Sequence, residues 1–485
     1  MSGRNVLFIM SDEHSRRVLG SYGNAAVRTP NLDRLAAEGT SFDNAYCNCP
    51  ICVPSRASFA TGRYVHETRC WDNAQPYVGQ PQGWGHRLIV AGRRSVSIGK
   101  LHYRNDTDPT GFDEQILPLH VLNGTGDGQA LMRSPPPKRP STRLLSADAG
   151  KGESTYLDYD RKIRDAAVDW IGKAAANPSP EPWCLFVSFV CPHFPLIAPP
   201  EFFDLYDQDA LPLPQGREPG TFPDHPVLKT LRATQNYEDH FRDERHVRTA
   251  INAYYGMVSF LDDNIGRVVG ALDRAGLKDD TVVVYSSDHG DNLGAHTLWG
   301  KSTMYEESAG VPLIVRGAGL PAGRRVSTPA TLVDSYQTIL EATGVPSTAA
   351  DEGLPGRSLL GLAAGAEEPD RTAFCEYHAV AAITGYYMIR WGNYKYVHFE
   401  GYAPQLFDLA DDPGELTDLS RDPAHAAAVA EGERRLRAIC DPTAVNALAF
   451  ADQKRRIEEL GGVDRVMGLK SYPYTPAPGE APRYA

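Results

Sequence analysis

The sequence predicts an α/β protein with a large mixed, mostly parallel sheet flanked by helices, and a smaller C-terminal α+β subdomain. First, short apolar runs alternate with helical segments between residues 5 and 286, which is typical of parallel sheets. Second, several of these runs stop at side chains that can bind a metal or an anion. Third, aromatic, aliphatic and polar residues mix after about residue 369, as they do in antiparallel strands.

Each predicted strand is a nearly continuous apolar run, as expected for a strand buried on both faces of a sheet. The runs cover residues 5–10, 95–99, 183–190 and 281–286. Two segments rich in Pro and Gly, residues 119–152 and 208–223, interrupt the pattern. We expect both to be surface insertions that form lids over a site.

Two helices are predicted between these strands. The first begins at Pro30, with Thr29 as its N-cap and Gly39 as its stop. The second carries apolar residues at alternating spacings of three and four from Ile251 to Leu272, which gives it one apolar face.

The C-terminal part has a different organisation. Residues 384–399, with a turn at 392–393, predict antiparallel strands, and residues 426–439 predict a helix. We therefore expect a main domain at 1–370, a subdomain at 371–450 and an extended tail at 451–485. The tail has no obvious core of its own, so we expect it to be an arm that joins subunits of a homodimer or homotetramer.

Composition excludes some classes of function. The formal net charge of −12 argues against a nucleic-acid-binding protein, which would show a basic face. An anionic ligand would need a local cluster of cations. The sequence shows neither a signal peptide nor an apolar stretch long enough for a membrane span, so we expect a cytoplasmic protein without a membrane partner. A disulfide framework is not expected from its eight cysteines.

The ends of the predicted strands carry the first functional signal. They lead into Asp12, Lys100, His193, and Asp288 with His289. Ligands of open α/β sheets bind beyond the carboxyl ends of the strands. One polar strand end would mean nothing, but this combination of carboxylates, imidazoles and an amine predicts a site.

Cys52 is the second signal, because the run Pro54-Ser-Arg-Ala57 after it can open a helix. A thiol at the positive end of a helix would have a lowered pKa and be reactive. An alternative is a zinc site made by Cys52 with Cys47, Cys49 and Cys70. That spacing is crowded and fits no common zinc finger.

The Cys-x-Pro-Ser-Arg run resembles the motif of the formylglycine-dependent sulfatases, in which the Cys is oxidised to formylglycine. Further segments from about residue 4 to about residue 440 are similar to that family. They are residues 5–12, 29–35, 42–46, 99–102, 287–291 with Lys301, and 406–415. The resemblance implies an alkaline phosphatase-like fold.

By that resemblance, a divalent cation is bound by Asp12, Asp288, His289 and one oxygen of modified Cys52. Mainly oxygen ligands favour calcium, and one imidazole keeps manganese and zinc open. Glu13 is either a further ligand or a hydrogen-bonding neighbour.

The resemblance also assigns roles in catalysis. Arg56 and Lys100 would hold the hydrated aldehyde, and Lys100 and Lys301 would bind sulfate oxygens. His102 would take a proton from the second hydroxyl, and His193 would protonate the leaving oxygen. An ordinary imidazole pKa of roughly 6.5 suits both tasks.

Three residues relate to the leaving group in this interpretation. Asn73 lies where related enzymes contact the substrate. Trp71 and Tyr77 suggest an aromatic pocket, which suits an aryl group and also a quaternary ammonium.

The resemblance implies a sulfuric ester hydrolase that acts on sulfate monoesters, with aryl sulfates expected, and that depends on a formylglycine-generating enzyme for maturation. Promiscuity toward phosphonate monoesters and phosphodiesters is expected. One alternative is a phosphonate monoester hydrolase or phosphodiesterase on the same scaffold, whose relatives tend to have neutral residues in place of Lys100 and His102. The other is an inactive, metal-binding pseudoenzyme.

Overall fold

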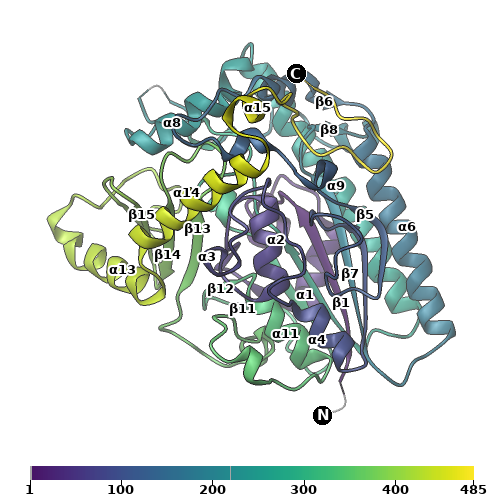
Figure 1. Cartoon of the computed structure of the whole chain (residues 1–485). Helices are drawn as coiled ribbons and strands as arrows, with labels where there is room; N and C mark the ends of the chain where they lie inside the picture. The colour runs from purple at the N-terminus through teal and green to yellow at the C-terminus, as the bar shows by residue number, and fades with distance from the viewer. Residues whose placement is uncertain (1–2, 219, 485) are drawn as a thin grey trace.

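The structure, a computed structural model, describes residues 3–218 and 220–484. Its centre is an eight-stranded sheet (Figure 1) in which β10 runs antiparallel to β9 and β2, while the other pairings are parallel. In spatial order the strands are β11 (Arg324–Val326), β2 (Thr40–Phe42), β10 (Leu313–Arg316), β9 (Thr281–Ser287), β1 (Asn5–Asp12), β7 (Trp183–Pro192), β4 (Arg94–Lys100) and β5 (Glu114–Leu119). The predicted fold class is confirmed.

The four strands predicted from apolar runs, β9, β1, β7 and β4, are neighbours at the centre of the sheet. Alternate residues of β1 enter two different cores: Phe8 packs on one face of the sheet and Ile9 on the other. Side chains of a strand alternate between faces, so an apolar run without alternation needs a helical layer on each side.

Helices supply these two layers. α2 (Cys52–Thr61), α4 (Trp84–Val90), α11 (Asp334–Ala342) and α12 (Leu359–Ala364) share the core with Phe8. α1 (Pro30–Glu38), α6 (Thr155–Ala176) and α9 (Glu244–Arg274) share the core with Ile9. Further helices are α3 (Val65–Thr68), α5 (Arg143–Asp148), α7 (Pro200–Phe203), α8 (Pro226–Gln235) and α10 (Glu306–Ala309).

The start of α1 is held differently from the prediction. Thr29 occupies the N-cap position without a side-chain capping bond, and its hydroxyl donates to Asp33 instead. The carboxylate of Asp262, on α9, accepts hydrogen bonds from the backbone amides of Asn31 and Leu32 at 3.1 and 2.7 Å. A distant carboxylate therefore satisfies the free amides that every helix N-terminus presents.

A four-stranded antiparallel sheet forms the C-terminal subdomain (Figure 1). Its strands are β13 (Ala373–Tyr377), β14 (Tyr386–Trp391), β15 (Tyr394–Phe399) and β16 (Gln405–Asp408), and helix α13 (Ala426–Ile439) follows. Phe374 of this sheet lies in the same core as Phe8 of the main sheet, so the subdomain has no separate interior in the described chain. The expected limit at 370/371 stays a proposal.

The tail is not wholly extended, because helix α14 (Pro442–Glu459) crosses the expected limit at 450/451 and α15 (Val463–Met467) follows it. Beyond α15 the chain, yellow in Figure 1, runs back over its own subunit. Gln129 donates to the carbonyl of Leu469 at 2.6 Å, and Tyr156 donates to that of Thr475 at 2.5 Å. The predicted role in subunit assembly stays a prediction.

Two short ladders complete the strands: β3 (Ala45–Tyr46) with β12 (Ala330–Thr331), and β6 (Gly150–Lys151) with β8 (Ile197–Ala198). Within the described residues, every helix is too short or too polar to cross a membrane.

Gly99 is predicted to be irreplaceable at the end of β4. Its φ is +98°, and a Cβ atom there would lie 2.2 Å from the carbonyl oxygen of Ser188 on β7. Gly92 has a φ of +73° with open space around it. We expect Gly92→Ala to lower the free energy of unfolding by about 1–2 kcal/mol through backbone strain. Gly99→Ala should cost a further 1–3 kcal/mol or so from the clash. Equal losses in urea unfolding would contradict this account.

Candidate functional site

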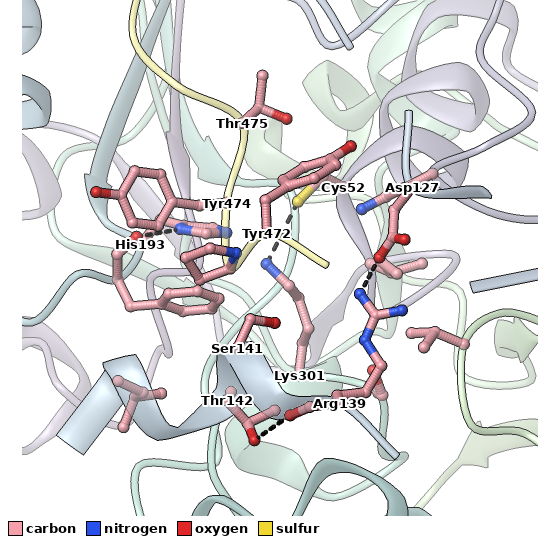
Figure 2. Close-up of a pocket in the computed structure, with 18 of the residues that line it drawn as sticks. Cys52, Asp127, Arg139, Ser141, Thr142, His193, Lys301, Tyr472, Tyr474 and Thr475 are labelled. Atoms are coloured by element: carbon pink, nitrogen blue, oxygen red, sulfur yellow. Dashed lines mark hydrogen bonds and ion pairs between the residues drawn. The ribbon is translucent and has the colours of Figure 1, made fainter. Parts of the chain in front are cut away.

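A cavity of about 100 Å³ opens at the carboxyl edge of the main sheet. Figure 2 shows Lys301 reaching toward Cys52 inside it, with Tyr474 and Thr475 of the tail on another side. Side chains from at least five separate parts of the chain line it. They include Cys52, Asn73, Lys100, His102, Asp127, Arg139, Ser141, Thr142, Tyr156, His193, Phe194, Gln235, Tyr237, Lys301, Tyr472, Tyr474 and Thr475.

Strand register brings the predicted site residues to this edge. Ser11 of β1 pairs with Ser287 of β9, so the next residues, Asp12 and Asp288, emerge side by side. The register of β1 against β7 shifts after Met10, and β7 leads directly into His193.

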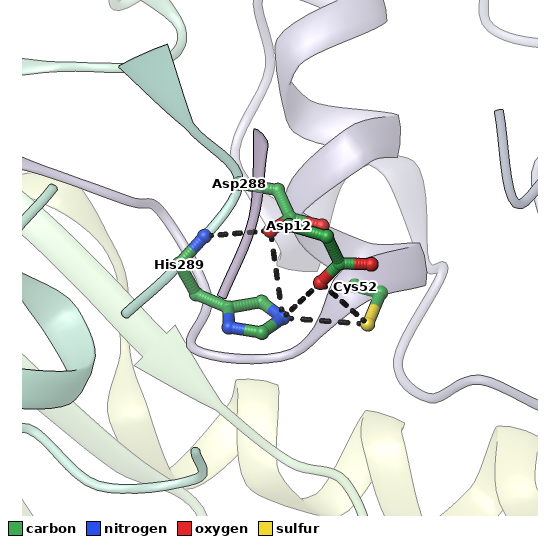
Figure 3. Close-up of side chains that lie close together, drawn as sticks. All are labelled: Asp12, Cys52, Asp288 and His289. Atoms are coloured by element: carbon green, nitrogen blue, oxygen red, sulfur yellow. Dashed lines mark hydrogen bonds and ion pairs between the residues drawn. The ribbon is translucent and has the colours of Figure 1, made fainter. Parts of the chain in front are cut away.

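Four of the predicted residues form one cluster (Figure 3): Asp12, Cys52, Asp288 and His289, whose ligand atoms all lie within 4.8 Å of one another. Nε2 of His289 is 3.3 Å from Sγ of Cys52, 3.5 Å from Asp12 and 3.6 Å from Asp288. Nδ1 of His289 lies 3.0 Å from the carbonyl of Gly290. A proton on Nδ1 would leave Nε2 free to bind a metal, as is usual for ligating histidines.

The residues fit a divalent cation. Two carboxylates and one imidazole offer oxygen and nitrogen ligands, and all four side chains are buried. Carboxylates packed this closely repel one another unless cations lie between them. The set is one that calcium, manganese or zinc can use.

The buried guanidinium of Arg56 offsets negative charge in the four-residue cluster by pairing with Asp288. Its guanidinium is 1% exposed, and Nε donates to Asp288 at 2.7 Å. Nη1 donates to the carbonyl of Lys100 and to the hydroxyl of Ser188, both at 2.9 Å. Burial would lower the pKa of Arg56, but Asp288 and Asp12 outweigh it and raise that pKa. Arg56 therefore stays charged and ties α2 to three strands.

Two lysines place positive charge around Cys52. Nζ of Lys100 forms an ion pair with Asp12 and lies 3.9 Å from Sγ of Cys52. Nζ of Lys301 lies 3.4 Å from the same sulfur and 3.0 Å from Glu13. Burial raises the pKa of Asp12, but Lys100 and other nearby cations outweigh it and hold that pKa well below its usual range.

Glu13 faces the lysine side of the site. Its Oε2 lies 3.0 Å from Lys301 and 3.3 Å from Nε2 of His193. It groups with Asp12 and His193 and lies outside the four-residue cluster. Burial raises the pKa of Glu13 well above its usual range, and Lys301 opposes this shift. Both predicted roles stay predictions, because Glu13 hydrogen-bonds Lys301 and also belongs, with Asp12 and His193, to a second group whose atoms lie close enough to hold a metal.

The two histidines differ from the expectation of ordinary imidazoles. Burial lowers the pKa of His102 well below 6.5, and Lys100 adds to the effect. Burial and then Lys301 do the same to the pKa of His193. Both rings are therefore neutral at pH 7 without a bound anion. A neutral imidazole suits a base, whereas an acid needs a bound anion that raises its pKa.

Cys52 is the first residue of α2, which places it at the N-terminus of that helix. Burial nevertheless raises the pKa of its thiol, and Asp12 raises it further. The expected lowering of the thiol pKa is therefore wrong, because desolvation and the two carboxylates outweigh Lys100 and Lys301. Cys47, Cys49 and Cys70 lie outside the metal-ligand groups found in the described chain, which removes support for a zinc-thiolate site.

Asn73 lines the cavity and its Oδ1 accepts a hydrogen bond from the amide of Val53 at 3.0 Å. It thus supports the start of α2 as well as facing the cavity. The predicted aromatic pocket of Trp71 and Tyr77 is wrong. Trp71 is buried with Nε1 donating to Asp452, and Tyr77 is buried with its hydroxyl donating to Pro81.

Five residues that were not predicted from the sequence line the part of the cavity called here the outer wall. Asp127 and Arg139 form an ion pair there, and Tyr472, Tyr474 and Thr475 come from the tail. The one available signal was the length of the insertion at residues 119–152, which was expected to be a lid and supplies Asp127 and Arg139. The described residues of the other expected lid, 208–218 and 220–223, do not line this cavity; Gln215 contacts Glu307 and the carbonyl of Gly414.

Comparisons with known proteins agree with this geometry. The model of the sulfatase family matches residues 4–345, and that of the N-sulphoglucosamine sulphohydrolase C-terminal region matches residues 294–441. Choline-sulfatase of Rhizobium meliloti is 31% identical over 434 residues, which is 86% of this chain and 83% of the relative. Human arylsulfatase K is 30% identical over 440 residues, which is 86% of this chain and 78% of the relative.

Solved structures share the fold. Phosphonate monoester hydrolase of Agrobacterium radiobacter superposes with a TM-score of 0.71 at 24% identity, covering 90% of this chain and 95% of the other. A protein in complex with its substrate D-glucosamine-2-N,6-O-disulfate superposes with a TM-score of 0.70 at 23% identity, covering 94% and 99%. The family match spans the whole strand edge described above, and the chain therefore belongs to the sulfatase family, the enzymes that hydrolyse sulfuric esters.

Proposed function

We propose that this sulfatase cleaves sulfate monoesters with a formylglycine made from Cys52. The observation that carries the proposal is the position of Cys52 at the start of α2, against three metal-ligand side chains and two lysines. A hydrated aldehyde at that position supplies one hydroxyl to attack sulfur and a second whose deprotonation releases sulfate. An ordinary serine could attack, but its sulfate ester would be hard to hydrolyse.

Asp12, Asp288, His289 and residue 52 would hold the divalent cation, with calcium favoured by the carboxylates. The cation would acidify a hydroxyl and neutralise sulfate oxygens. Arg56 orients Asp288, and Lys100 holds residue 52 and a sulfate oxygen. Lys301 binds the sulfate from the opposite side, where Glu13 orients it.

His102 and His193 move protons in this proposal. His102 is neutral at pH 7 and takes the proton of the second hydroxyl. His193 contacts Glu13 at 3.3 Å and protonates the leaving oxygen once the negative charge of the bound sulfate ester raises its pKa. Its Nδ1 lies 2.6 Å from the carbonyl of Phe194, which fixes the ring and leaves Nε2 toward the cavity side.

Phosphonate monoester and phosphodiester hydrolysis is the second candidate, since a structural neighbour is such a hydrolase by name. The positive pair of Lys100 and Lys301 suits any tetrahedral anion, so promiscuity is part of the proposal. Lys100 and His102 favour sulfate as the native group, because relatives that act on phosphonates tend to have neutral residues at these positions. The filled catalytic positions disfavour an inactive pseudoenzyme.

The leaving group is set by the outer wall. Arg139 is 8% exposed and pairs with Asp127; Asp127 is the one carboxylate among the lining residues of the described chain. Arg139 already neutralises Asp127, and Lys100 and Lys301 add positive charge to the cavity. Among residues 3–218 and 220–484, the lining therefore has no unpaired carboxylate that could bind a cationic leaving group. Tyr472, Tyr474 and Tyr237 supply aromatic surface. We therefore propose a ring-bearing alcohol, such as an aryl group, and disfavour choline.

Maturation by a formylglycine-generating enzyme follows from the proposed nucleophile. A cytoplasmic location and assembly as a homodimer or homotetramer stay predictions.

Mass spectrometry tests whether Cys52 is converted to formylglycine. We expect the tryptic peptide from Leu35 to Arg56, taken from protein made in its native host, to carry an aldehyde or its hydrate at Cys52. Cys52→Ala should abolish sulfate ester hydrolysis, whereas Cys184→Ala, on β7 in the core, should retain it if the protein folds. An intact thiol in active protein would remove the proposed mechanism.

Substitution of His102 tests whether a sulfate ester or a phosphonate ester is the native substrate. We expect His102→Ala to lower kcat for an aryl sulfate by about 10²–10⁴-fold, the usual contribution of a general base. Activity on a phosphonate monoester should fall less, since relatives manage that reaction with a neutral residue there. Equal losses on the two substrates would contradict the preference for sulfate, and a wild-type enzyme inactive on phosphonates would contradict promiscuity.

Leaving-group selection is tested at Arg139. The wild type should have a kcat/KM for 4-nitrophenyl sulfate at least about tenfold above that for choline sulfate. Arg139→Ala leaves Asp127 unpaired, so that its carboxylate can attract the quaternary ammonium of choline sulfate. One such close charge pair should shift the ratio of the two kcat/KM values about tenfold toward choline sulfate. Arg104→Ala, which breaks an exposed pair with Asp108, is the matched control. An unchanged ratio in Arg139→Ala speaks against this subsite.

A further inference from the structure

The tail contacts one of the proposed catalytic residues, His102, directly. Oγ1 of Thr475 lies 2.9 Å from Nε2 of His102, across 373 residues of sequence. Both residues line the cavity that contains Cys52, and His102 is 5% exposed. A hydroxyl can either donate to or accept from an imidazole nitrogen, so this contact can fix the ring.

Thr475 is itself held in place. Its carbonyl accepts a hydrogen bond from Tyr156 at 2.5 Å. The ring of the preceding residue, Tyr474, packs on Tyr156 with centroids 5.0 Å apart, and it contacts Phe194 at 6.3 Å. Tyr156 also lies edge-on to His193 at 6.0 Å. The hydroxyl of Thr475 is therefore positioned by α6 and by the loop after β7.

His102 has few other restraints. Its backbone has a φ of +59°, held by a hydrogen bond from its amide to the carbonyl of Leu119 at 2.8 Å. Its Nδ1 is buried, without a hydrogen-bond partner among residues 3–218 and 220–484. Neutral imidazole carries a single ring proton. With that proton on Nε2 and donated to Thr475, the lone pair of Nδ1 is free to accept a proton.

We propose that Thr475 is a positioning residue for His102, so that the C-terminal tail completes the active site of its own subunit. The inference rests on the proposed function, which makes His102 the base. Thr475 acts by fixing the tautomer and orientation of that ring.

A double-mutant cycle tests this coupling. Thr475→Val keeps the shape and removes the hydroxyl, so kcat for an aryl sulfate should fall about 3- to 10-fold, the loss of one hydrogen bond, while KM changes little. In a His102→Ala background, Thr475→Val should have no further effect. Thr475→Ser should retain activity. A full effect of Thr475→Val without His102 overturns the proposal.

A control variant, Thr155→Val, tests whether any weakening of tail docking lowers activity. It removes another tail contact, the hydrogen bond from Thr155 to Glu480 at 2.6 Å. That control should stay within about twofold of wild type. A loss in Thr155→Val as large as in Thr475→Val would assign the effect to tail docking and overturn the proposal.

A second readout does not depend on turnover. In histidine-labelled protein with unmodified Cys52, the ¹⁵N shifts of His102, identified by their absence in His102→Asn, should report a proton on Nε2. Thr475→Val should change these shifts, and identical shifts would overturn the proposal. If the wild type fails to hydrolyse any sulfate ester while these shifts still respond, the proposed function fails and the positioning contact stands.

Discussion

Charge balance in a buried place is the constraint on which this structure depends. Asp12, Glu13 and Asp288 are fully buried at the end of the main sheet. An isolated buried charge costs tens of kcal/mol in a dry interior, so a buried carboxyl group either pairs with a cation or becomes neutral through a raised pKa. Each of the three has a cation beside it, although burial still raises the pKa of Glu13. Arg56 pairs with Asp288, Lys100 with Asp12, and Lys301 with Glu13. These ion pairs lower the free-energy cost of burying charged groups. They also supply the site with cationic side chains that can bind an anion and with carboxylates that can bind a metal.

Parallel strands make that concentration of charge possible. Their carboxyl ends meet at one edge, and the register of β1 against β9 brings Asp12 beside Asp288. The left-handed backbone at Gly99 lets β4 approach β7 closely just before Lys100. α2 then enters from one face with Cys52 at its first turn and Arg56 one turn later. The strand ends and the first turns of α2, which form the inner part of the cavity, are thus held in place by the core of the sheet.

The outer wall has a different origin. It is built from the insertion that holds Asp127 and Arg139 and from the end of the chain at Tyr472 to Thr475. These segments contact one another and α6 through polar groups. Ser141 bonds Ser471 at 2.7 Å, Asp148 pairs with Arg483, and Tyr156 of α6 donates to the carbonyl of Thr475. The proposed chemistry therefore resides in the geometry of the strand ends, whereas the proposed selection of the leaving group resides in loops and the tail.

The sequence by itself determined the central strands, because a run such as residues 5–10 is apolar on both faces and can only be buried. It also determined the inner site, because Asp12, Lys100, His193 and Asp288 follow strands that end at one edge. It did not determine the roles of Trp71, Tyr77 and Thr475, nor the pKa of Cys52. Those depend on which distant segments pack together and how much water they exclude. Such long-range packing is a property of the whole chain, and only the tertiary structure decided it.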